Sequence, residues 1–96
     1  MERYQIFLDS KTGLVPGTLD LCQTEQGVTG YVTMIGHGTE ITSGTIEGNE
    51  RRFDGTIWYK EQEVLFSADG EVNDEVLELN VHIGELLIPL TGFSIA

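Results

Sequence analysis

The sequence predicts an all-β fold: a single-domain antiparallel meander of about eight short strands that closes into a barrel-like shape. Thr, Ile and Val make up 25 of the 96 residues, whereas Ala occurs twice, a bias that favours strands over helices. Apolar and polar residues alternate with a period of two along most of the chain, and no helical period is present. Short segments rich in Gly, Asn and Asp interrupt this alternation at intervals typical of hairpin turns. One domain is expected to span residues 1–96, because the chain is too short for a second.

The strands are justified in order by the turn that follows each of them. Gly, Asn and Asp supply the positive φ that tight hairpins need, so each such cluster predicts a reversal of the chain. In the first half, the strands with their turns are 4–9 before Ser10–Gly13, 17–23 before Glu25–Gly27, 28–35 before Gly36-His37-Gly38, and 39–47 before Gly48-Asn49-Glu50. In the second half they are 51–60 before Gln62–Glu63, 64–72 before Asn73–Asp74, 75–83 before Gly84–Glu85, and 86–95.

These turns also predict a register that aligns the glycines. The expected pairs are Gly30 with Gly44, Gly44 with Gly55, Gly55 with Gly70, and Leu77 with both Gly70 and Gly92. Five glycines would then form a row across adjacent strands, interrupted only by Leu77. Glycine on a concave face relieves crowding where strands bend, a common device of small barrels.

The same register sorts the side chains into an apolar and a polar face. A single sheet with one apolar face must bury that face on itself, either as a closed barrel or as a strongly coiled two-sheet sandwich. The expected core comprises Ile6, Leu8, Leu19, Leu21, Val28, Val32, Met34, Ile46, Phe53, Ile57, Tyr59, Phe66, Ala68, Val72, Leu77, Leu79, Val81, Ile83, Leu86, Ile88 and Leu90.

The interior is the first place where a ligand could bind. An eight-stranded barrel is either just filled by its side chains or holds one small ligand. A row of glycines would leave room beside Gly44 and Gly55, and Glu40, Thr42 and Tyr59 are the polar groups expected to point inward. This arrangement would suit a small-molecule carrier or a small enzyme, the alternative being that large side chains fill the gap.

A cluster of carboxylates is expected on the outer face. The register places Asp54 across from Glu71 and Asp69 across from Glu78. Like charges opposed in a sheet destabilise it unless a cation or a basic protein partner offsets them. A solvated acidic face is the simplest interpretation, since no calcium-binding loop motif accompanies these residues.

Apolar side chains are also expected on the outer face. Ile41 is predicted to lie opposite Trp58, with Leu65, His82 and Leu87 in line across three strands and Tyr31 nearby. A contiguous group of this kind marks an interface more often than not, and aromatic residues are typical anchors. The expected role is contact between copies of the chain, a dimer first of all; a different partner or burial within the monomer are the alternatives.

Composition excludes several partners and chemistries. A net charge of -11, with only Arg51 and Arg52 adjacent, argues against nucleic acid and anionic membrane. No signal peptide is expected, because the first residues lack a basic segment followed by a long apolar run. The sequence also shows no nucleophile, phosphate-loop, dinucleotide or zinc-ligand motif, so no catalytic residue, cofactor or metal is expected. Cys22 is the only cysteine, which favours the reducing cytoplasm. The sequence therefore predicts a cytoplasmic, non-catalytic interaction module that self-associates through an apolar outer sheet face.

Overall fold

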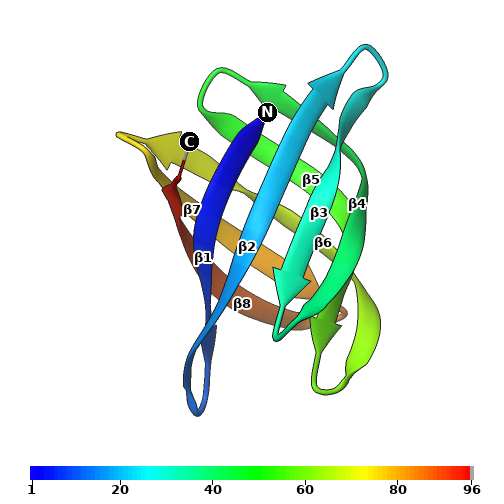
Figure 1. Ribbon diagram of the computed structural model, residues 1–96, viewed down its shortest axis with the longest axis vertical. Coiled ribbons are helices and arrows are strands. Elements are labelled where there is room, and N and C mark those ends of the chain that lie inside the picture. The colour runs from blue at the N-terminus through cyan, green and yellow to red at the C-terminus, as the bar shows by residue number, and fades with distance from the viewer. Residues whose placement is uncertain (96) are drawn as a thin grey trace.

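The computed structural model describes residues 1–95 and shows eight antiparallel strands that close into a barrel, as predicted. Each strand pairs with the next in sequence, and the last pairs with the first (Figure 1). The closed barrel therefore replaces the sandwich alternative. The strands are β1 (Glu2–Ser10), β2 (Gly13–Thr24), β3 (Gly27–Met34), β4 (His37–Glu47), β5 (Glu50–Tyr59), β6 (Gln62–Asn73), β7 (Val76–Ile83) and β8 (Leu86–Ser94).

Every connection between consecutive strands is a two-residue turn. Gly48 and Gly84 open their turns with φ values of 58° and 60°, as type II′ hairpins require. The turn at Lys60–Glu61 instead places two ordinary residues at φ values of 50° and 63°, and Ile35 sits at 51° before Gly36. Residues of these types seldom adopt positive φ, so turn chemistry alone does not predict these two reversals.

The predicted row of glycines is wrong, because four of its five pairings are shifted. The structure pairs Leu77 with Gly92 as predicted, but Gly30 with Ile41, Gly44 with Phe53, Gly55 with Phe66, and Gly70 with Leu79. The hairpin between β7 and β8 turns at Gly84–Glu85, where the sequence predicts it. The first hairpin also turns where predicted, at Lys11–Thr12, and the second turns within the predicted Glu25–Gly27. The turns after β3, β4, β5 and β6 lie one to two residues from their predicted centres, and each of these displacements shifts the register of the strands that the turn joins.

Inward-facing glycines stand opposite large side chains rather than opposite one another. A Cβ at Gly44 would lie 2.7 Å from the Cβ of Phe53, and one at Gly92 would lie 3.1 Å from Ile6 and 3.3 Å from Leu77. The missing side chains thus make room for bulky neighbours, so the interior is packed and not hollowed by a glycine row.

Most of the predicted core is correct, because a register shift by an even number of residues leaves every side chain on its face. Leu86 is wrong: it is 44% exposed, since the ladder between β8 and β1 ends at Leu90 and no strand covers the start of β8. Ile46, Tyr59, Val72 and Ile83 are only partly buried. The buried apolar cluster is Tyr4, Ile6, Leu8, Leu19, Leu21, Val28, Val32, Met34, Ile41, Phe53, Ile57, Phe66, Ala68, Leu77, Leu79, Val81, Ile88 and Leu90.

A bulge in β4 explains the one reversal of faces. The register with β5 shifts between Ile41 and Ser43. Before this bulge Thr39 and Ile41 point inward, and after it Gly44 does. The sequence prediction placed the odd residue in a three-residue turn around His37, whereas the chain turns at Ile35–Gly36 and accommodates the extra residue within the strand.

Candidate functional site

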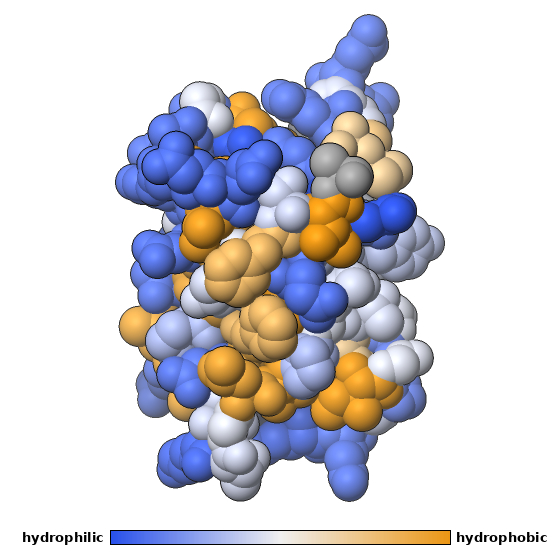
Figure 2. Space-filling model, turned by 60° about the vertical axis from the view of Figure 1, so that its left-hand side comes forward, coloured by the Kyte–Doolittle hydropathy of each residue, from blue (hydrophilic) through white to orange (hydrophobic). Residues whose placement is uncertain are grey.

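A largely apolar area covers the outer surface of β8, β1 and the start of β2, with the exposed Asp9, opposite Leu14, as the charged residue within it. We call it the apolar sector and define it as Phe7, Leu14, Pro16, Leu87, Pro89 and Phe93. Leu14, Leu87 and Phe93 are 65%, 54% and 46% exposed. Figure 2 brings the side of the barrel with β7, β8 and β1 forward and shows apolar side chains gathered across the middle of this face.

Pairing of the strands makes the sector continuous. Thr91 on β8 lies opposite Phe7, and Phe7 lies opposite Pro16 on β2. The rings of Phe7 and Phe93 meet edge to face, with 6.1 Å between centroids and 67° between planes. This contact is of the geometry that aromatic pairs prefer, so the two rings hold each other in place while one face of the pair stays open to solvent.

The two prolines lie where hydrogen-bonded ladders end. Pro89 directly precedes Leu90, the last residue of β8 that pairs with β1, and Pro16 directly precedes Gly17, the first residue of β2 that pairs with β3. Proline has no N–H to donate, so it blocks the addition of another strand at both places. A partner on the apolar sector would therefore pack against side chains and not extend the sheet.

The outer surface of β4 to β7 carries the opposite character. Glu47 faces Glu50, Glu50 faces Glu71, and Glu71 faces Glu78, which together form an acidic row across four strands. Beyond Glu78 the same line continues through Thr91 into the apolar sector. Directly opposed carboxylates repel one another, so the acidic row costs stability that the apolar interior must offset.

The predicted pairing of carboxylates is wrong, although the acidic surface exists. Asp54 lies between Ser43 and Ser67, not opposite Glu71. Asp69 lies between Arg52 and Asn80, not opposite Glu78, and its Oδ2 is 3.4 Å from the Nε2 of His82. The shifts at the β5–β6 and β6–β7 turns cause both errors.

The residues predicted as an interface do not form one surface. Ile41 is buried at 2% exposure because of the bulge, and it faces Gly55 and not Trp58. Trp58 is partly buried, and its ring stacks on His37 with 3.7 Å between centroids. Leu65, His82 and Leu87 do lie on the neighbouring strands β6, β7 and β8: His82 pairs with Leu87, and Leu65 lies two residues from Ser67, which pairs with His82. Tyr31 is exposed on β3, apart from these three.

The residues predicted for an interior pocket are also separated. Glu40 and Thr42 are exposed on the outer surface, and the Thr42 hydroxyl donates to the backbone carbonyl of Asp54 at 3.4 Å. Tyr59 is partly buried near a turn, and Gly44 and Gly55 face large side chains across the ladders. The polar groups needed to recognise an interior ligand are therefore not gathered inside the barrel.

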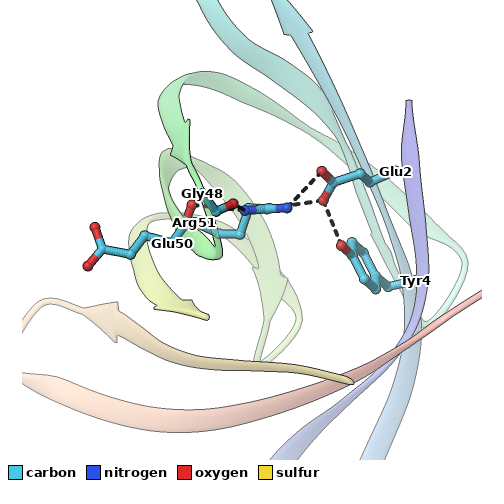
Figure 3. Close-up of polar contacts among 5 residues, drawn as sticks. All are labelled: Glu2, Tyr4, Gly48, Glu50 and Arg51. Atoms are coloured by element: carbon cyan, nitrogen blue, oxygen red, sulfur yellow. Dashed lines mark hydrogen bonds and ion pairs between the residues drawn. The ribbon is translucent and has the colours of Figure 1, made fainter. Parts of the chain in front are cut away.

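One polar cluster was not predicted from the sequence. Arg51 on β5 reaches across the end of the barrel to β1, where its Nε and Nη2 each donate to the Glu2 carboxylate at 3.0 Å (Figure 3). The Tyr4 hydroxyl donates to the same carboxylate at 2.6 Å. Arg51 also donates to the carbonyls of Gly48 and Glu50. Arg51 and Glu2 occupy inward positions in phase with Phe53 and Ile6, and that phase is the sequence signal that could have revealed this cluster.

The cluster, which we call the barrel-end cap (Glu2, Tyr4 and Arg51), perturbs two ionisations. Burial alone would raise the pKa of Glu2, but hydrogen bonds from Arg51 and Tyr4 and the charge of Arg51 outweigh it and hold that pKa below its ordinary 4.5. Burial, together with the hydrogen bond to the negatively charged Glu2, raises the pKa of Tyr4 from 10.0 to about 12. The cap thus works as a structural tie between strands that are not neighbours.

Comparisons with known proteins and a search for metal-binding groups add no further site. No family model matches the chain, and no curated protein aligns with it significantly. Among residues 1–95, no three or more His, Cys, Asp or Glu side chains are placed to hold a metal ion. Within the same range, no helix is long and apolar enough to cross a membrane.

Proposed function

We propose that this barrel is a non-catalytic interaction module that self-associates through an apolar part of its outer sheet face. The observation that carries the proposal is the set of large apolar side chains exposed on the outside of a barrel whose interior is already packed. Contiguous exposed apolar surface is typical of interaction sites, whereas scattered single residues are not. One free cysteine and the acidic composition are consistent with the cytoplasm as its compartment.

The acidic row supports a second, basic protein partner. Four carboxylates paired across neighbouring strands create a negative surface that would speed and orient the approach of Lys- and Arg-rich surfaces. The row meets the apolar sector at Glu78, which pairs with Thr91, so a basic partner bound at Glu47 and Glu50 would leave the sector open to a second copy.

Light scattering tests self-association directly. At about 100 μM protein we expect a mass near twice the 10.6 kDa of one chain. A mass near 10.6 kDa, that of a single chain, at this concentration would show that the exposed apolar surface does not mediate self-association.

A further inference from the structure

We infer that the apolar sector is the surface on which a second copy of the chain docks, about a two-fold axis, to form a closed dimer. The inference rests on the proposed self-association and specifies which of the exposed apolar groups mediates it. Three features select the sector over the other exposed residues: its size, the distribution of charge, and its single occurrence on the barrel.

The size of the sector suits a small dimer. Leu14, Leu87, Phe93 and the neighbouring Ile95 are 65%, 54%, 46% and 44% exposed. These four side chains leave on the order of 400 Å² of apolar surface open, against about 800 Å² per partner in a standard interface. Uncharged neighbours such as Gln5, Thr18 and Thr91 border it and supply the remaining contact area. Tyr31 and Ile35 are as exposed, but they lie on β3 and in the turn after it, where Tyr31 stands between Asp20 and Glu40. Leu65 on β6 lies outside the sector, separated from Leu87 by His82 of β7.

Charge favours a second copy at this surface. Each chain carries a net charge of -11, so two copies repel each other unless their contact excludes most of the carboxylates. Asp9, opposite Leu14, is the one carboxylate within the sector, whereas the four carboxylates of the acidic row lie on β4 to β7. Docking sector to sector keeps Glu47, Glu50 and Glu71 out of the contact. The repulsion that the contact must overcome then comes from Asp9 and from Glu78, which borders the sector opposite Thr91.

A single sector limits the assembly to two copies. When one surface packs against the same surface of a second molecule, the two-fold contact uses that surface completely and the assembly closes. Because the eight strands close into a barrel, no free sheet edge is left to which strands could add and continue into a filament. The structure thus accounts for a dimer rather than an open polymer.

Sedimentation equilibrium of the full chain and two matched variants tests the inference. Phe93→Asp places a carboxylate in the sector, and Leu65→Asp places one at an equally outward apolar residue on β6, where Leu65 is 78% exposed. We expect Phe93→Asp to weaken dimerisation more than about 100-fold and Leu65→Asp to change it less than about threefold. Leu87→Asp, in the same sector, is measured alongside in case Phe93→Asp loses its β-sheet circular dichroism.

The possible outcomes separate this inference from the proposed function. If the wild-type chain forms dimers that Phe93→Asp and Leu87→Asp leave intact, the sector assignment is wrong and self-association stands. Species larger than a dimer would overturn the closed two-fold arrangement. A wild-type chain that remains monomeric overturns both, even if its sector is then found to hold lipid vesicles or another protein.

Discussion

The barrel-end cap should contribute more to stability than any exposed ion pair of this protein. We take Glu2→Met and Arg51→Met, singly and together, because methionine matches glutamate in length, keeps most of the apolar stem of arginine, and removes the charge of each. The Arg51 side chain is 10% exposed and donates two charge-assisted hydrogen bonds to Glu2, whose side chain is 32% exposed. A hydrogen bond to a charged group contributes about 1.5–3 kcal/mol, and the partial exposure of Glu2 reduces the effect. We therefore expect a coupling free energy of about 2 kcal/mol, so that the double variant is less destabilised than the sum of the single variants.

Urea unfolding followed by the fluorescence of Trp58 and by circular dichroism measures the four free energies of the cycle. All samples are compared at one protein concentration, because self-association also shifts the apparent stability. The ion pair of Arg3 and Asp20 provides the control: the Nε of Arg3 lies 2.8 Å from the Oδ1 of Asp20, but the two side chains are 54% and 30% exposed. That pair should couple by about 0.2–1 kcal/mol. If the cap couples no more strongly than this control, burial across the barrel end does not strengthen the ion pair, and the argument fails.

Two further predictions concern pH and the bulge. The pKa of Tyr4 is higher in the folded chain (about 12) than its ordinary 10.0, so its contribution to stability is complete below pH 10 and is lost as the pH rises toward 12. Urea midpoints between pH 8 and pH 11.5 should fall more steeply for the wild type than for Tyr4→Phe, with Tyr31→Phe as the exposed control; equal slopes for wild type and Tyr4→Phe would contradict the hydrogen-bonded cap. The bulge makes Ile41 a core residue and leaves Thr42 outside, so Ile41→Ala should cost about 2–5 kcal/mol of unfolding free energy and Thr42→Ala less than about 0.5 kcal/mol. The reverse order would mean that the faces of this half of β4 are as the sequence alone suggests.

The fold class and the core could be predicted from the sequence because both depend on alternation alone. Phe53, Phe66 and Leu79 are buried as expected, although their strands are paired two or four residues away from the expected register. An even shift preserves the face of each side chain, so the hydrophobic pattern remains correct when the turn position is wrong. A predicted pair such as Asp54 with Glu71 depends on the exact register, so it is wrong whenever the turn is misplaced.

The candidate surfaces could not be predicted for the same reason. A surface depends on which strands place their outward residues side by side, and this is determined by turns whose residues carry little conformational signal. Lys60 and Glu61 form a tight turn at positive φ, although neither is a residue type that favours it. The closure of β8 on β1 is a contact between the two ends of the chain, and it alone brings Phe7 beside Phe93. Rules based on neighbouring residues cannot predict a contact between the two ends of the chain.

The barrel-end cap shows how far the alternation rule extends when charged residues are included in it. Arg51 stands two residues before Phe53, and Glu2 stands two before Tyr4, so both follow the inward phase of their strands to the end of the barrel. There the interior meets water, and an inward charge need not be fully dehydrated if an opposite charge reaches it from across the opening. The pair therefore closes the barrel where an apolar side chain would be left exposed. By the same reasoning, a charge in phase with the core at a strand terminus should be examined for a partner on a distant strand before it is assigned to the solvent.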